Sequence, residues 1–236
     1  MAMSNKTLRP RAIGFNPKSI SGLAMWLDAA DSSTITLDAG AVSEWRDKAI
    51  GSTFVQTTPN NRPGQTTING RNALLFDGSN DTLSCADPFT TYPLSMFFVQ
   101  RIVAHTNFGM TYTVGADNNF NLRQNGTNGL IQFQMPTTAP ISSTAVSTTA
   151  AQLISVVFES TAVNSVGYVN NAALTITTGS FSQPTLSGTH YIGTRAGGFP
   201  MNGYIGEILI YSKTVSTLER SRISKYLGKK WGITVS

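Results

Sequence analysis

Short apolar runs alternate with turn-forming residues along most of the chain. The longest run is SMFFVQRIVAH at residues 95–105, and QLISVVF at residues 152–158 is another. Gly, Asn, Asp and Ser separate the runs about every ten positions, the spacing of short strands joined by turns. This pattern predicts an all-β chain in which two antiparallel sheets pack as a β-sandwich, or jelly roll, in one main domain.

One segment near the end of the chain has helical periodicity instead. Ser216 and Glu219 match a capping box, and Gly232 stands where a helix commonly stops. Apolar side chains recur near helical spacing between them: Leu218, Ile223, Tyr226, Leu227 and Trp231. The pattern predicts a single C-terminal helix over residues 216–231 with one apolar face.

The first seventeen residues are predicted to form an extended arm, and residues 18–236 the sandwich. Pro10 and Pro17 favour extended backbone, and the segment has no acidic residue and no periodic apolar face. It buries too little apolar surface to fold alone, so we expect it to become ordered on a partner. The expected partner contacts are Lys6, Leu8, Arg9, Arg11, Ile13 and Phe15.

Composition and charge limit the class of protein without identifying a function. Only 12% of the 236 residues are charged, about half of the ~25% that is usual in soluble proteins. The formal net charge is +5, and most of the basic residues lie near the two ends of the chain. Such basic ends fit nucleic acid or an acidic protein partner as well as a solvated surface. We expect no nucleic-acid partner.

The cysteine count and the absence of long apolar runs lead to expectations about disulfides, membrane insertion and the site of synthesis. Cys85 is the single cysteine, so no disulfide can form within the chain. No run approaches the ~18 apolar residues of a membrane span, and we expect no insertion into a membrane. The first residues contain no apolar core of a secretory signal, so synthesis in the cytoplasm is expected.

Three segments together resemble a known family. They are residues 21–49, SGLAMWLDAADSSTITLDAGAVSEWRDKA, residues 68–84, INGRNALLFDGSNDTLS, and residues 203–233, GYIGEILIYSKTVSTLERSRISKYLGKKWGI. Their order is similar to that of concanavalin A-like, laminin-G-like jelly-roll domains, which are frequent in bacteriophage structural proteins and bacterial surface proteins.

The resemblance implies where several residues lie. The first strand, at 24–27, and a late strand, at 204–211, would lie close together in one sheet. Glu207, among apolar neighbours, would be a paired structural carboxylate. The pattern also predicts a buried set: Trp26, Trp45, Phe76, Phe97, Val99 and Leu209.

Catalytic signatures are absent from the sequence. Glycoside hydrolysis needs two carboxylates across one sugar bond, and the nearest acidic pairs, such as Asp77 and Asp81, fall at turns or strand ends. The two histidines, His105 and His190, lie in no recognisable motif, and a G-x-S-x-G sequence is missing. We expect no catalytic residue and no enzyme activity.

Two kinds of ligand site are still compatible with the sequence. Calcium, the one cofactor considered, prefers hard oxygen ligands. Asp77, Asn80 and Asp81 are candidates, as are Asp117, Asn118 and Asn119. Glycan binding would use aromatic rings with hydrogen-bonding neighbours, and the candidates are Phe108, Tyr112, Arg195 and Phe199.

These observations lead to one functional expectation and two alternatives. The expectation is a non-catalytic phage virion component, such as a capsid decoration, head-fibre or tail-associated protein, attached to a capsid or tail protein through its arm. It would be located in the virion as a homo-oligomer on the particle. The first alternative is a glycan-binding adhesin or receptor-binding module that recognises a host surface glycan. A remote alternative is a glycoside hydrolase.

Overall fold

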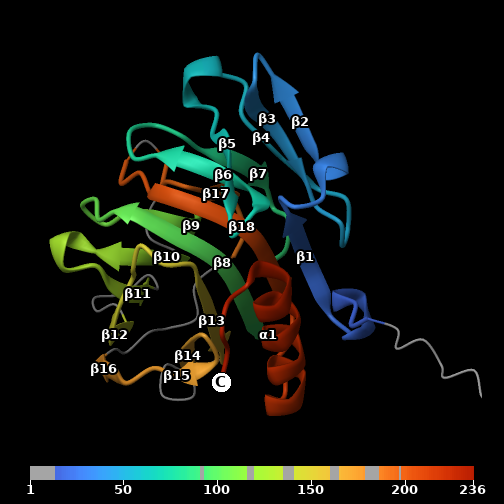
Figure 1. Cartoon of the computed structure of the whole chain (residues 1–236), viewed down its shortest axis with the longest axis vertical. Coiled ribbons are helices and arrows are strands. Elements are labelled where there is room, and N and C mark those ends of the chain that lie inside the picture. Colours follow the sequence, from blue (N-terminus) through green and yellow to red (C-terminus); the bar gives the residue numbers. More distant parts are fainter. Residues whose placement is uncertain are drawn as a thin grey trace, which may run out of the picture.

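Two antiparallel sheets and one C-terminal helix, α1, form the described part of the chain (Figure 1). The computed structural model describes residues 14–90, 93–115, 120–134, 141–159, 165–178, 186–196 and 198–236. The helix covers one sheet, whose other side faces the second sheet (Figure 1). The predicted two-sheet antiparallel sandwich with one C-terminal helix is thus confirmed.

The sheet that carries the helix has eight strands. Seven of them follow the order β15 (Ala172–Ala173), β14 (Val166–Val169), β13 (Gln152–Phe158), β8 (Leu94–Ala104), β18 (Asn202–Tyr211), β6 (Arg71–Asp77) and β5 (Gly64–Ile68). The eighth, β1 (Leu23–Asp28), pairs with β18. The first half of β18 pairs with β6 and the second half with β1, so these two strands share one edge of β18.

The second sheet has ten strands. Their order is β16 (Ile176–Thr178), β12 (Ile141–Val146), β11 (Leu130–Gln134), β10 (Phe120–Asn125), β9 (Met110–Val114), β17 (Thr189–Ile192), β7 (Leu83–Ala86), β4 (Thr53–Val55), β3 (Ala41–Arg46) and β2 (Ile35–Asp38). Short 3₁₀ helices connect or precede strands: η1 (Pro17–Ser19), η2 (Ser32–Thr34), η3 (Pro59–Asn61) and η4 (Gly126–Asn128).

The side chains of the eight-stranded sheet contribute to two apolar layers, one on each face. Between the sheets, Trp45 and Phe76 are completely buried. Between this sheet and α1, a second layer contains Trp26, Phe97, Val99 and Leu209. All six predicted core residues are therefore buried, four of them under the helix. Because both faces are covered, central strands such as β13 are buried along their whole length.

The C-terminal helix has the predicted ends. α1 spans Thr217–Trp231, with Ser216 and Glu219 in a reciprocal capping box and Gly232 in the left-handed conformation after the last turn. Its buried residues include Ile223, Leu227 and Trp231.

The prediction was wrong for Leu218, which is 71% exposed. Leu218 lies five positions before Ile223, and five residues rotate a side chain by about 140° around the helix axis. Leu218 therefore points away from the sheet that buries Ile223. The apolar character of Leu218 therefore did not indicate which face of α1 is buried.

A buried carboxylate connects β18 to the helix. Glu207 has no exposed surface, and its Oε1 accepts hydrogen bonds from Nε1 of Trp26 at 2.8 Å and the hydroxyl of Tyr226 at 3.1 Å. Its Oε2 accepts one from Nε1 of Trp231 at 2.7 Å and lies 2.7 Å from Nζ of Lys230. The pairing expected for Glu207 is confirmed, and it joins β1, β18 and α1.

Asp28, the cross-strand partner of Glu207, extends this network of charges. Lys230 contacts both carboxylates, and Lys48 lies 3.1 Å from Asp28. Burial raises the pKa of Glu207, and the nearby charge of Asp28 acts in the same direction, while Lys230 opposes both. The two lysines therefore compensate for holding two carboxylates close together in the interior.

The backbone at Gly206 makes room for the helix. A Cβ atom at this position would lie 2.7 Å from ring carbons of Trp231, closer than van der Waals contact allows. The absence of a side chain on Gly206 lets the Trp231 ring rest directly on β18, with its indole N–H within reach of Glu207.

Replacing Glu207 with alanine is expected to destabilise the fold strongly. The change leaves the indole N–H groups of Trp26 and Trp231 buried without their acceptor, and Lys230 keeps only one of its two carboxylate partners, Asp28. Breaking a buried pair in this way costs about 3–5 kcal/mol. Urea unfolding followed by tryptophan fluorescence would measure the loss. Glu44→Ala removes an exposed carboxylate from β3 and should change the free energy of unfolding by less than about 0.5 kcal/mol. Equal stability of the two variants would contradict the assigned role of Glu207.

Candidate functional site

Two connections between strands meet at one end of the sandwich. They are the β8–β9 connection, residues 105–109, and the β17–β18 connection, residues 193–201. The Met110 amide donates to the Phe199 carbonyl at 3.1 Å, and the Thr106 hydroxyl donates to the Pro200 carbonyl at 2.6 Å. Arg195 and Gly198 exchange two backbone hydrogen bonds of 3.0 and 2.7 Å. These bonds hold the connections in a fixed arrangement, which suits a preformed site.

Each connection presents one phenylalanine in an uncommon backbone conformation. Phe108 has φ 55° and Phe199 has φ 61°, values that are unfavourable for bulky side chains. Their rings are 5.7 Å apart and nearly perpendicular at 80°, and both side chains are only partly buried. Strained residues of this kind cluster at functional sites, so the pair marks this end of the molecule as a candidate site.

An arginine lies over each of these rings. The Arg123 guanidinium is 4.5 Å from the Phe108 ring centroid, and that of Arg195 is 4.8 Å from the Phe199 centroid. Arg123 comes from β10 and donates to Gln132 Oε1 at 2.9 Å. Burial, together with the charge of Arg195, lowers the pKa of Arg123 to about 10. At neutral pH the site therefore holds two positive charges close together.

A small polar cavity adjoins this cluster. It has a volume of about 190 Å³ and is lined by Asn61, Ser79, Asn80, Thr82, Thr194, Gly198 and Pro200. The residues on either side of Phe199 thus form part of its wall. The Thr82 hydroxyl is buried and has no hydrogen-bond partner among the described residues. A buried hydroxyl without a partner is unfavourable, and a bound polar ligand would satisfy it.

The structure brings together three of the four predicted glycan-contacting residues, Phe108, Arg195 and Phe199. The prediction was wrong for Tyr112, which is fully buried between the sheets. Its hydroxyl donates to Nδ1 of His190 at 2.6 Å, and Nε2 of that ring donates to the Leu186 carbonyl. Burial lowers the pKa of His190 to about 4, so this buried pair is neutral at physiological pH.

Two residues of the site were not predicted. Arg123 is a polar residue within the strand FNLRQN, and alternation of polar and apolar positions there gave a usable signal that it faces away from the core. Thr82 gave no such signal, because its role depends on the 194–200 segment lying beside the β6–β7 turn.

The proposed calcium ligands instead shape a turn. Asp77 Oδ1 accepts hydrogen bonds from the backbone amides of Ser79 and Asn80 at 2.7 and 3.4 Å, and Asp81 Oδ2 accepts one from the Asp77 amide at 2.9 Å. In the described ranges, no group of three or more His, Cys, Asp or Glu side chains is arranged to hold a metal ion. The other candidates, 117–119, lie outside the described residues.

Only the last part of the predicted arm is described. Lys6, Leu8, Arg9, Arg11 and Ile13 lie outside the described residues.

The boundary predicted after residue 17 was too late. Pro17 is buried, and its carbonyl accepts a hydrogen bond from the Tyr211 hydroxyl at 3.2 Å. Phe15 packs on the helix, with its ring 5.5 Å from that of Tyr226. Phe15 and Pro17 therefore contact the sandwich and α1 within the same chain.

Similarity to known proteins is structural only. No protein-family model matches the chain, and no curated protein matches its sequence. A sialidase from Trypanosoma rangeli, in complex with sialic acid, matches with a TM-score of 0.62 and 13% identity over 89% of this chain and 33% of that chain. The chain therefore spans about a third of the sialidase's length.

Two further solved structures share the fold. Domain 4 of AbnA, a GH43 extracellular arabinanase from Geobacillus stearothermophilus in complex with arabinotriose, has a TM-score of 0.62 and 12% identity over 86% of this chain and 97% of the domain. The receptor-binding domain of botulinum neurotoxin type G has a TM-score of 0.59 and 12% identity over 87% of this chain and 51% of that chain. At such identities the likeness shows the fold, a jelly-roll-like β-sandwich.

Asp81 should make the stability of the protein depend on pH. Burial raises its pKa to about 6, whereas the unfolded value is about 3.9. The native state therefore binds more protons between these values, and the free energy of unfolding should fall as the pH rises from 4 to 6. Urea unfolding at several pH values would show this decrease. In Asp81→Asn the decrease should be smaller, and an unchanged pH dependence would contradict the assignment.

Proposed function

We propose that this chain is a glycan-binding module that recognises a surface receptor through the site at the 105–109 and 193–201 connections. The observation that carries the proposal is the position of the Phe108–Phe199 pair beside a cavity lined by hydroxyl and amide groups. Ligand sites combine apolar and aromatic surface with a few well-placed polar groups. A sugar ring offers the same combination, with an apolar face of C–H groups and a rim of hydroxyls.

Each part of the site has a matching role toward a sugar. The partly exposed ring of Phe199 would pack against the apolar face of one sugar residue. Thr82 and Asn80, in the adjoining cavity, would exchange hydrogen bonds with its hydroxyls. The Thr82 hydroxyl would then gain the partner that it lacks within the chain.

The two arginines favour an acidic glycan. A carboxylate on the sugar can form charge-assisted, two-pronged hydrogen bonds with a guanidinium group. Arg123 has no ion-pair partner among the described residues, so its charge is available to a ligand. An anionic ligand would also reduce the repulsion between Arg123 and Arg195. Sialylated or uronic-acid glycans are therefore the proposed class.

The comparisons support a binding role without naming a ligand for this chain. The matched arabinanase domain was solved with arabinotriose, and the matched neurotoxin segment is a receptor-binding domain. We propose that the present chain acts likewise by binding and not by catalysis. The buried pair Glu207 and Asp28 supports this, because neither carboxylate is exposed enough to meet a substrate.

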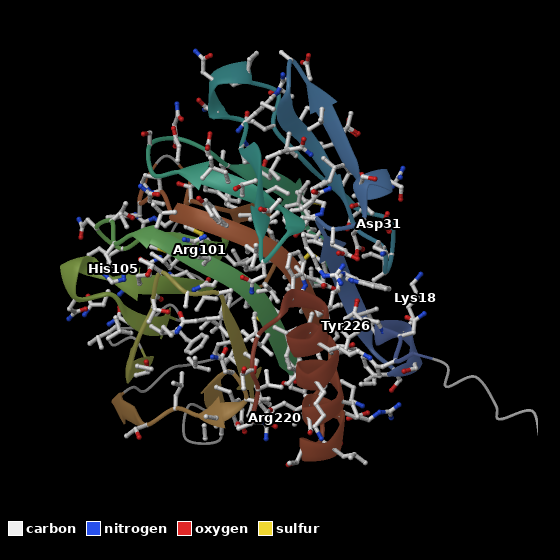
Figure 2. The ribbon with its side chains drawn as sticks, in the orientation of Figure 1. Lys18, Asp31, Arg101, His105, Arg220 and Tyr226 are labelled. Carbon is white, nitrogen blue, oxygen red and sulfur yellow. The ribbon has the colours of Figure 1, made fainter. Side chains whose placement is uncertain are left out.

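A virion location is a second proposal. The basic, acid-free residues 1–13 precede the point where Phe15 packs on α1. Fixing the arm at Phe15 would present Lys6, Arg9 and Arg11 to a capsid or tail protein. His105, which begins the β8–β9 connection, lies on the other side of the molecule from Lys18 (Figure 2), so the glycan site would stay accessible. The basic arm carries this proposal.

Removing the two phenylalanine rings should weaken glycan binding strongly without unfolding the protein. Phe108→Gly and Phe199→Gly suit the left-handed backbone at both positions. On an array of sialylated, uronic-acid and neutral glycans, the wild type should bind the acidic ones, and more weakly as salt increases. The double variant should lose about tenfold or more in affinity. Leu37→Ala, an exposed apolar change on β2, is the control.

Three results would count against this proposal. The first is the absence of binding to any glycan on the array. The second is an equal loss of affinity in the Leu37→Ala control. The third is a preference for neutral glycans that Arg123→Gln leaves unchanged, which would remove the role of the arginines.

Deleting residues 1–13 tests the virion proposal separately. Because the described contacts of the sandwich begin at residue 14, the truncated chain should keep its circular dichroism spectrum and its thermal unfolding midpoint. The full chain should co-sediment with purified virus particles, and the truncated chain should not. Equal sedimentation of both chains would show that the arm is not the attachment point.

A further inference from the structure

A basic cavity lies between α1 and the first described residues of the chain. It has a volume of about 560 Å³ and is lined by Gly14, Phe15, Arg71, Arg222, Lys225, Tyr226, Lys229 and Lys230. Figure 2 shows Tyr226 on the side of the helix toward Lys18, whereas His105, which begins the β8–β9 connection, lies at the other side of the molecule. The cavity is therefore distinct from the proposed glycan site.

Positive charge dominates this cavity. Five of its eight lining residues are lysine or arginine, and none of the eight is acidic. Two of these five basic side chains already have partners within the chain. Lys230 pairs with Asp28 and Glu207, and the Arg71 side chain donates to the Lys230 carbonyl.

The other three cations are not neutralised. Arg222, Lys225 and Lys229 form no ion pair and no side-chain hydrogen bond with any residue of the chain that is described. Their spacing of three and four positions places them on one face of α1. They rise along the helix axis by about 4.5 and about 6 Å. The three side chains therefore form a short row of unpaired positive charges beside the cavity.

An aromatic wall adjoins this row. The rings of Phe15 and Tyr226 have centroids 5.5 Å apart, and the Arg222 guanidinium lies 5.4 Å from the Phe15 centroid. The hydroxyl of Tyr226 already donates a hydrogen bond to Glu207. A ligand in the cavity would therefore contact mainly the ring of Tyr226. A ligand that fits must therefore combine negative charge with an apolar group.

We propose that this cavity binds an acidic segment of a protein partner. Carboxylates of the segment pair with Arg222, Lys225 and Lys229, while an aliphatic or aromatic side chain packs against Phe15 and Tyr226. The volume suits a few residues of a peptide, since sites for drug-sized ligands measure about 300–1,000 Å³. A nucleic acid would need a longer track of cations to follow its phosphates, and this row spans less than three helical turns.

Calorimetry with a defined peptide tests the proposal. The probe is an acetylated and amidated heptapeptide with three glutamates on each side of a central leucine. Titrated into the full chain, it should bind at low salt and lose affinity as salt is added. The same peptide with glutamine in place of glutamate should not bind. A single-stranded DNA of six phosphates, titrated in parallel, should bind more weakly than the acidic peptide.

Variants then locate the site. Arg222→Gln combined with Lys229→Gln should weaken peptide binding by about tenfold or more, since each lost charge-assisted contact contributes more than a neutral one. Phe15→Ala should weaken binding without changing the salt dependence. Arg46→Gln combined with Arg101→Gln removes the same net charge from exposed strand positions and should leave the affinity within about twofold.

The proposal is overturned by any of three outcomes. In the first, the glutamine peptide binds with the same affinity as the glutamate peptide. In the second, the Arg46 and Arg101 control loses as much affinity as the Arg222 and Lys229 variant. In the third, the DNA binds more tightly than the acidic peptide. The last outcome would assign the helix face to nucleic acid. Circular dichroism of each variant shows that a loss of binding is not a loss of folding.

Discussion

The four contacts to the Glu207 carboxylate hold the two ends of the folded chain together. Trp26 reaches it from the first strand, and Trp231, Tyr226 and Lys230 reach it from the last helix. A buried carboxylate is unfavourable by itself, so its position is stable only while all these donors are present. Without them α1 would lose its polar anchor on the sheet. The apolar layer under the helix and the basic cavity beside it both depend on that anchor.

Local patterns account for the parts of the fold that were predictable from the sequence. The capping box at Ser216 and Glu219 and the alternation in the strands act over a few residues, and these features matched the structure. Leu218 and Tyr112 were misplaced for physical reasons. The first turn of a helix can point past the sheet, and Tyr112 is the middle residue of β9 and not a strand-end residue, so its side chain is held in the core between the sheets.

The ligand sites were less predictable, because each combines segments that are distant in sequence. Thr82 and Pro200 line one cavity although more than a hundred residues separate them, and Phe15 meets Tyr226 across almost the whole chain. Only the strand order places these pairs side by side. The sequence offers the residue types, such as Phe199 and Arg195, and alternation marks Arg123 as facing away from the core, but no local pattern predicts the cavity beside them.

The division of one edge of β18 between β6 and β1 has a consequence for biosynthesis. β18 lies at the centre of the eight-stranded sheet, yet its residues are made after those of β1, β6 and β8, and the helix that covers them follows. Before β18 has been synthesised, β1, β6 and β8 are present but cannot be joined through it. Contacts this distant in sequence form slowly. Assembly of the sheet around β18 must therefore wait until β18 has been made, and until then the apolar strands need protection from aggregation, for example by chaperones.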